Sequence, residues 1–317
     1  MRRRVSCLAP GRTIPLQCRD ARARAHVVPG LLRPRRAARM AVPVVRGGVA
    51  MRGEVSPECW FGEFNLDVHH TMDWRVGPLS FRVHRGDHEW RLCIDAGGDP
   101  YSTVAERVIR EEHQADVDDG KVERFLVSSE TPRLRVGVLL PDRPIVSRPT
   151  SPVSVPSGEA VRFYVSSPLW VSLSVGDPER RLIEFPSLRL SDTWFGPNTR
   201  EGTLCYGTRT RCRLNLSEHP YLPNRAITPL VIRNQGPDLL RLDRIKLPVA
   251  TLSLYRSSGP GWLWTQPVTL VREESADMAV LQLGSGAPEE AGDAVRVAGP
   301  RETPQRYALI RAFSGLF

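Results

Sequence analysis

Proline and glycine interrupt this chain at short intervals, and that spacing limits what the chain can fold into. The 317 residues include 28 Pro and 25 Gly. Proline removes a backbone donor and ends helices, so long helices have little room between such breaks. The runs between the breaks recur about every eight to twelve residues, a spacing typical of β-sandwiches and β-barrels.

The runs are rich in β-branched, aromatic and other apolar residues, which predicts strands. Strands and helices do not alternate along the chain. The sequence therefore argues against a parallel doubly wound sheet. Only residues 102–114 have helical spacing, with Ser102 as a cap and Val104, Val108 and Ile109 at helical positions. We therefore predict a mainly β fold: an antiparallel β-sandwich architecture of two packed β domains with at most one or two short helices. The expected strands are residues 82–94, 124–128, 134–140, 161–165, 170–175, 182–185, 203–206, 212–216, 230–233, 239–242, 247–255, 262–271, 278–283 and 307–313.

The best candidate for a domain boundary is residues 141–158, which hold five prolines with serines between them. Proline disfavours both the interior of a helix and a central strand of a sheet, so this segment is expected to form neither. It predicts an N-terminal β-rich domain at 51–140 and a C-terminal β-sandwich domain at 159–317, joined by a Pro/Ser-rich linker. The same segment is equally compatible with an edge strand. Within the second half, residues 228–255 place two apolar runs around a Gly-Pro turn, which predicts a β-hairpin.

The excess positive charge lies entirely in residues 1–50. They contain 12 Arg and one acidic residue, Asp20, whereas residues 51–317 hold 32 basic and 34 acidic residues, a net charge of −2. We expect a disordered basic tail, or a translation start placed too far upstream, with Met40 or Met51 as the true start. The chain has 42 Arg and only two Lys, which indicates a high-GC genome.

Several classes of function find no support in the sequence. The near-neutral body lacks the basic field that nucleic acid requires, and no apolar stretch approaches the roughly 18 residues of a membrane span. Four scattered cysteines in the body without a Cys-x-x-Cys pair fit a reducing cytoplasm and no disulfide framework. No nucleophile elbow or phosphate-binding glycine loop occurs. We therefore expect a cytoplasmic protein with no cofactor, no nucleic-acid partner and no assignable catalytic residue.

The densest polar cluster surrounds two aromatic residues in residues 191–201. As a binding loop, it would offer aromatic faces to a ligand, with charged side chains fixing the ligand's orientation. The alternative is structural: polar groups that serve their own turn and a tryptophan that covers a sheet edge. A third hypothesis is an acid/base pair formed by Asp192 and Glu201. The candidate binding residues are Asp192, Thr193, Trp194, Arg200, Glu201 and Tyr206.

A second polar stretch, residues 67–73, reads Asp-Val-His-His-Thr-Met-Asp. As a strand it would place Asp67, His69 and Asp73 on one face, together with Thr71. That face is compatible with a metal site, but the spacing matches no known ligand pattern, so we assign no metal and favour a solvated polar face. At the other end of the chain, an alternating pattern places Tyr307, Leu309, Phe313 and Phe317 on one face, which predicts a final core strand.

Three sets of motifs are familiar when they are taken together. They lie at residues 74–79 with 89–91, at residues 166–170 with 191–197, 200–202 and 204–206, and at residues 311–314. The combination resembles the uncharacterised prokaryotic domain-of-unknown-function family 432, over about residues 60–317. The resemblance implies no established activity, cofactor or catalytic residue. The resemblance does not extend to the tail. Because such genes are associated with mechanosensitive-channel genes, the resemblance also implies a protein partner at the membrane.

Two hypotheses about function follow. The first is a non-catalytic binding or protein-interaction module associated with a membrane channel, since no catalytic constellation occurs and aromatic residues in exposed loops suit recognition. The alternative is a hydrolase or carbohydrate-active enzyme that uses a carboxylate pair in residues 191–201.

Overall fold

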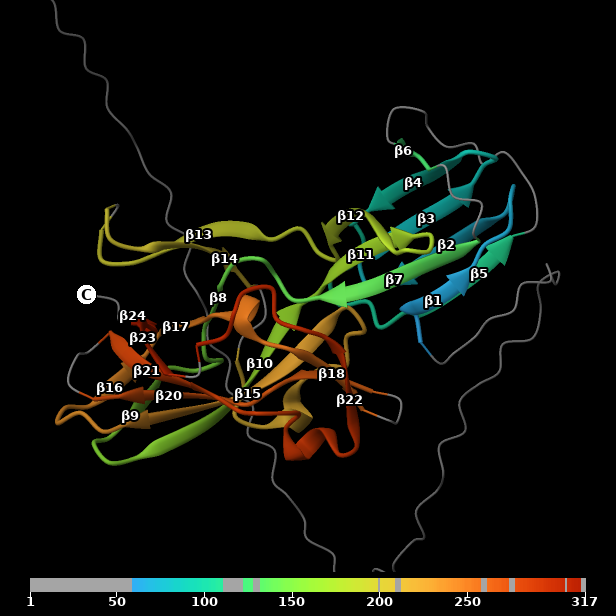
Figure 1. Ribbon diagram of the computed structural model, residues 1–317. Coiled ribbons are helices and arrows are strands. Elements are labelled where there is room, and N and C mark those ends of the chain that lie inside the picture. The colour runs from blue at the N-terminus through green and yellow to red at the C-terminus, as the bar shows by residue number, and fades with distance from the viewer. Residues whose placement is uncertain are drawn as a thin grey trace, which may run out of the picture. The chain divides into compact units, whose positions relative to one another are not determined.

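The computed structural model describes residues 59–110, 122–127, 132–198, 200–208, 212–257, 261–273, 277–305 and 307–314. Strands dominate these residues (Figure 1). Their only helical segments are three single 3-10 turns, η2 (Leu216–Glu218), η3 (Val249–Thr251) and η4 (Glu289–Ala291). The prediction of a mainly β fold is therefore confirmed. No helix in the described part of the chain is long and apolar enough to span a membrane.

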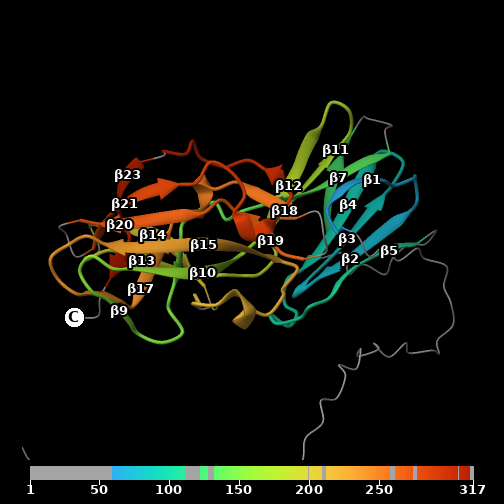
Figure 2. The same ribbon diagram turned by 90° about the horizontal axis from the view of Figure 1, so that it is seen from below.

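Two antiparallel sheets build the first part of the fold (Figures 1 and 2). A five-stranded sheet has the order β5 (Ala105–Arg110), β2 (Thr71–Val76), β3 (Leu79–Arg85), β4 (Glu89–Asp95) and β6 (Val122–Leu126). A four-stranded sheet has the order β1 (Gly62–Asn65), β7 (Arg133–Leu139), β11 (Trp170–Val175) and β12 (Arg180–Pro186).

Aromatic side chains join these two sheets face to face. Trp74 of β2 stacks on Phe81 of β3 with ring centroids 4.7 Å apart, and Phe81 meets Phe185 of β12 edge-on at 5.6 Å. Every second residue of β2 and β3 is buried, as expected for strands with one face in a core. The alternating pattern therefore produces a sandwich with its outer face left polar.

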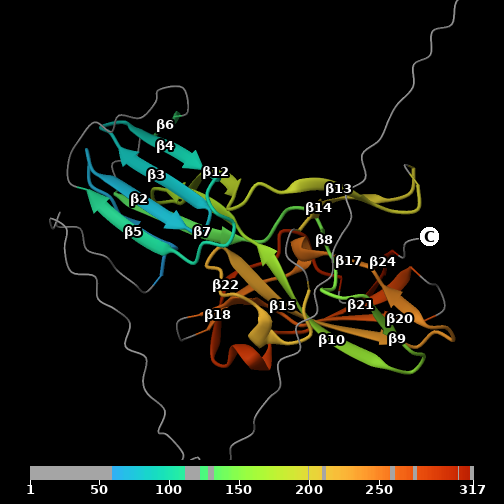
Figure 3. The same cartoon turned by 180° about the vertical axis from the view of Figure 1, so that it is seen from behind.

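An eight-stranded sheet forms the centre of the second part (Figure 3). Its longest strand, β15 (Arg225–Asn234), pairs with β10 (Ala160–Pro168) on one edge. On the other edge β15 pairs first with β19 (Leu263–Thr265) and then with β20 (Val268–Arg272). Pro229 falls in the gap between these two pairings, so its missing N–H costs no bond on that edge. The remaining strands are β18 (Leu254–Ser257), β21 (Met278–Leu283), β22 (Ala294–Ala298) and β23 (Tyr307–Arg311).

Two smaller sheets complete the fold. One has five strands in the order β13 (Ser191–Phe195), β14 (Thr203–Gly207), β8 (Ile145–Ser147), β17 (Arg244–Leu247) and β24 (Phe313–Ser314). The other pairs β16 (Leu240–Leu242) with β9 (Val153–Val155). The strands β8 and β9 both lie in the proline-rich segment 141–158. The strands β11 and β12, which follow this segment, pair in one sheet with β7, which precedes it.

Residues 51–317 group into one compact unit. Their division into domains at 51–140 and 159–317 stays a prediction. The basic tail lies outside the described residues, so the expectations for it also stay predictions.

Besides the run 82–94, which forms two strands, and the run 212–216, which forms only isolated bridges before η2, three local predictions from the sequence are wrong. Residues 105–110 of the expected helix 102–114 form β5, because the exposed edge of β2 pairs with them over six residues; residues 111–114 lie outside the described part. The expected hairpin in residues 228–255 is also wrong, because β15 and β16 pair with other strands. The turn between them does form, and Arg272 holds it by donating to Asn234 Oδ1 and the Asp238 carbonyl.

The third wrong prediction concerns the face of the last strand. Tyr307 and Leu309 are exposed on β23, whereas Phe313 is buried on β24 in a different sheet, and Phe317 lies outside the described residues. The N–H groups of Ala312 and Phe313 both donate to the Asp277 carbonyl, so the alternation breaks at this point.

Candidate functional site

The polar cluster of residues 191–201 forms most of a β-hairpin, β13–β14, with its turn at residues 196–202. Asp192 pairs with Tyr206 and Trp194 pairs with Leu204 across the two strands. These four side chains therefore share one face, which we call the outer face of the hairpin. Thr193 lies on the opposite, inner face together with Phe195 and Cys205.

The inner face fastens the hairpin to the rest of its sheet. Phe195 and Cys205 are fully buried and form a small cluster with Val146 of β8. Arg244 of β17 donates to the Trp194 carbonyl at 3.0 Å and to Thr193 Oγ1 at 3.3 Å. Burial lowers the pKa of Arg244 and raises the pKa of the Cys205 thiol. The inner face is thus a packed support for the hairpin.

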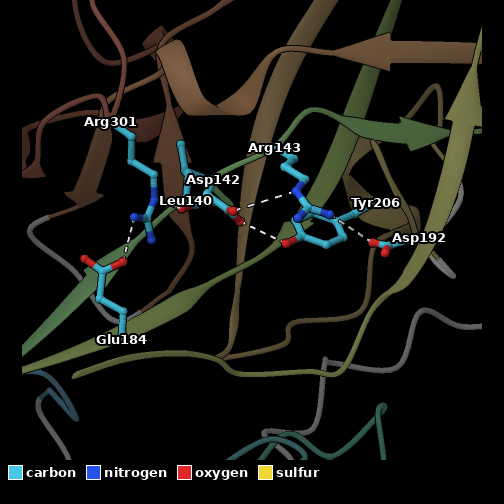
Figure 4. Close-up of polar contacts among 7 residues, drawn as sticks. All are labelled: Leu140, Asp142, Arg143, Glu184, Asp192, Tyr206 and Arg301. Carbon is cyan, nitrogen blue, oxygen red and sulfur yellow. Dashed lines mark hydrogen bonds and ion pairs between the residues drawn. The ribbon is translucent and has the colours of Figure 1, made fainter. Parts of the chain in front are cut away.

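Charged residues from the β7–β8 turn meet the base of the outer face (Figure 4). Tyr206 Oη donates to Asp142 Oδ1 at 3.0 Å, and Arg143 Nη1 lies 3.3 Å from Asp192 Oδ1. The Arg143 guanidinium also lies over the Tyr206 ring, 5.3 Å from its centroid. Burial, together with the hydrogen bond to Asp142, raises the pKa of Tyr206.

A second contact fixes the start of the same turn. Arg301 Nε donates to the Leu140 carbonyl at 2.6 Å, and its Nη1 lies 2.7 Å from Glu184 Oε2 on β12 (Figure 4). Leu140 stands two residues before Asp142 in the chain. The Arg301 side chain therefore positions the backbone from which Asp142 and Arg143 reach the hairpin.

The tip of the hairpin holds Trp194 in one orientation. Its indole Nε1 donates to the Asn198 carbonyl at 2.7 Å. Asn198 Oδ1 accepts the backbone N–H groups of Arg200 and Glu201, both at 2.8 Å, which closes the turn. A Cβ atom on Gly202 would lie 2.6 Å from the indole nitrogen, so only glycine lets the ring lie over the turn. Trp194 as a whole is 40 % exposed.

The structure brings only some of the sequence-predicted residues together. Asp192, Trp194 and Tyr206 share the outer face, Thr193 points inward, and Arg200 and Glu201 lie in the turn. The assignment of these residues to a binding site stays a prediction. Sequence reasoning missed Leu204, which only the cross-strand register places beside Trp194. It also missed Asp142, Arg143 and Arg244, which come from segments distant in the chain.

The second polar stretch does not form the strand face that would hold a metal. The strand β2 begins at Thr71, and His69 adopts a positive φ of 67° in the turn before it. Asp73 forms ion pairs with Arg82 and Arg110. No group of three or more His, Cys, Asp or Glu side chains within the described ranges could hold a metal ion.

The fold and the hairpin define a mainly β protein with an exposed aromatic hairpin face. Residues 60–317 match the family described as "Protein of unknown function (DUF432)", and the chain therefore belongs to this family. This match confirms the resemblance seen in the sequence motifs, over the same residues. No curated protein and no solved structure matches the chain.

Proposed function

We propose that this chain is a non-catalytic protein-interaction module whose partner binds the outer face of the β13–β14 hairpin. The observation that carries the proposal is the pair of Trp194 and Leu204. They stand directly opposite each other and are 40 % and 42 % exposed. Tryptophan is enriched among the residues that dominate protein interfaces, and aromatic residues are enriched at interface centres.

The pairing of the hairpin supports an interface at its tip. The strand β14 pairs with β8 only at Tyr206 and Gly207, so this ladder does not extend to the half of the hairpin that carries Trp194 (Figure 1). The Asn198 turn and the support beneath Phe195 hold the indole in place before any partner arrives. Because a fixed side chain loses little rotamer freedom on binding, this arrangement favours affinity.

Charged groups surround the apolar pair, as in the polar rim of an interface. Asp192 and Arg143 lie at the base of the hairpin, and Arg200 and Glu201 lie in its turn. We propose a partner at the membrane, namely the cytoplasmic side of a channel protein, and a cytoplasmic location for this chain. The support is the association with channel genes that the family resemblance implies, together with a rim that carries both signs of charge.

The alternative, a hydrolase or carbohydrate-active enzyme, needs Asp192 and Glu201 to act on one bond. Asp192 lies at the base of the hairpin, whereas Glu201 lies in the turn beyond Phe195. Three residues of strand span about 10 Å, so the two backbones are at least that far apart. Asp192 also forms an ion pair with Arg143, so the two carboxylates belong to different parts of the hairpin, and we favour the interaction module.

Site-specific photocrosslinking in the native host tests the proposal. A photoreactive amino acid replaces Leu204 in the full chain, and crosslinked proteins are identified by mass spectrometry in separated membrane and soluble fractions. The matched control carries the same amino acid in place of Leu239, which is 51 % exposed and lies outside the hairpin. We expect one membrane protein to crosslink at position 204 and not at position 239.

Affinity for the purified partner then provides the quantitative test. Trp194→Ala should weaken binding by at least about 2 kcal/mol, roughly 30-fold, if the indole is a central contact. Leu204→Ala should also weaken binding, and Leu239→Ala should not. A crosslinked partner that binds Trp194→Ala as tightly as the natural chain would place the interface elsewhere. The absence of any specific crosslink in either fraction would reopen the enzyme hypothesis.

A further inference from the structure

The outer face of the five-stranded sheet β5-β2-β3-β4-β6 contains a groove of about 510 Å³. This volume falls within the range of roughly 300 to 1,000 Å³ that is usual for small-molecule sites. The groove lies on a different sheet from the β13–β14 hairpin. A role for it is therefore independent of the proposed protein interaction.

Two guanidinium groups converge on one carboxylate in the groove. Arg82 of β3 donates to Asp73 through Nε at 2.5 Å and through Nη2 at 3.4 Å. Arg110 of β5 approaches the same carboxylate from the opposite neighbouring strand, with its Nε 3.0 Å from Asp73 Oδ2. The hydrogen bond to Asp73 raises the pKa of Arg82. Two cations share one anion here, so this end of the groove is locally positive, whereas the groove as a whole is lined by three Arg and three acidic residues.

The contacts with Asp73 also orient the guanidinium groups. Each guanidinium carries five N–H donors, and the contacts with Asp73 use only one edge of each. A guanidinium already fixed by a carboxylate matches an oxyanion in a bidentate way without further loss of freedom. Asp73 thus orients both guanidinium groups, and its contacts leave other N–H donors on each of them.

The strand register sets the orientation of such a ligand. Asp73, Arg82 and Cys93 are neighbours in one row across the sheet, and Arg75, Ser80 and Asp95 form the next row. Glu106 pairs with Arg75 at the end of that second row. The carboxylates of Asp95 and Glu106 disfavour an anionic group at the second row. The anionic group of a ligand therefore fits better beside Arg82 and Arg110.

We propose that this groove binds a small organic anion whose carboxylate or phosphate group is held by Arg82 and Arg110. The rest of the molecule points toward Ser80 and Asp95, where a hydroxyl or amine on the ligand finds acceptors. Nothing in the proposal requires a chemical step.

Cys93 provides a reporter because its side chain lines the groove. The full chain is treated with an uncharged maleimide, and modification is followed for each cysteine by peptide mass spectrometry. The probes are inorganic phosphate and succinate, at constant ionic strength. Cys59, which is half-buried and outside the groove, is the control within the same molecule. We expect at least one probe to slow the modification of Cys93 and to leave Cys59 unchanged.

Variants separate the groove from the arginines of the tail, which also attract anions. Arg110→Gln should weaken the protective binding about tenfold, and Arg82→Gln with Arg110→Gln should abolish it. The charge-matched control is Arg241→Gln, an exposed position on β16. Arg110→Gln alone leaves the Arg82–Asp73 pair intact and so tests the idea even if the double variant fails to fold. Protection that persists in Arg110→Gln, or Cys93 reactivity that neither probe changes, overturns the proposal.

Discussion

Gly202→Ala tests whether the hairpin really holds Trp194 in place. The new Cβ would lie 2.6 Å from the indole nitrogen and 2.7 and 2.8 Å from two ring carbons. Ordinary contacts between such atoms are about 3.5 to 4.0 Å, so the ring must move by roughly 1 Å. That movement breaks the bond from Trp194 to the Asn198 carbonyl, which contributes about 0.5 to 1.5 kcal/mol.

The expected effect on global stability is small. Replacing glycine by alanine restricts the unfolded chain, which offsets about 0.4 to 1 kcal/mol of the loss. We therefore expect the free energy of unfolding to change by less than about 1 kcal/mol, while the position of the indole changes clearly. Gly202→Ala is thus expected to move the Trp194 ring with little change in the free energy of unfolding.

Indole N–H signals in a ¹H–¹⁵N NMR spectrum provide the assay. The chain has seven tryptophans, and Trp194→Phe identifies the signal that belongs to Trp194. In Gly202→Ala this signal should shift and its hydrogen exchange should accelerate. The control is Gly286→Ala, because a Cβ at Gly286 meets nothing within 4 Å. An unchanged Trp194 signal in Gly202→Ala would refute the packing argument and remove the main support for a preformed interface.

Three further predictions concern the pH dependence and stability of the fold. Burial lowers the pKa of His219, whose Nε2 contacts the Tyr164 carbonyl, so its contribution to stability is present above pH 6.5 and is lost as the pH falls through the folded-state pKa. His219→Gln should therefore lose less stability than the natural chain between pH 7 and pH 5 in urea titrations, with a difference of at most about 1.4 kcal/mol per pH unit; equal losses would contradict this. Burial raises the pKa of the Cys212 thiol to about 12, so maleimide should modify it only after urea unfolds the chain, and rapid modification of the folded chain would be the opposing result. Trp74→Ala should lower the free energy of unfolding by about 3 to 5 kcal/mol, because the ring is fully buried and donates to the Trp60 carbonyl; a loss below about 1 kcal/mol would show that this core is not packed as described.

Local patterns in the sequence predicted many of the strands but not their partners. The run at residues 170–175 coincides with β11, since alternation and β-branched residues are properties of the segment itself. Its pairing with β7 and β12 depends on segments far along the chain. The error at residues 105–110 has the same origin. The weak helical pattern did not prevail, because residues 105–110 join the β2 ladder over six residue pairs.

The candidate site was likewise predicted only in part from the sequence. The sequence by itself determined a mainly β fold, a membership in the family and a polar, aromatic cluster at residues 191–201. Only the tertiary structure decided that Trp194 meets Leu204, that Arg143 reaches Asp192, and that Arg82 and Arg110 converge on Asp73. Much of the secondary structure follows from side chains that are neighbours in the sequence, whereas a site follows from strand register. Register is chosen by the packing of whole sheets, because a slip of one residue would turn every side chain of a strand to the wrong face.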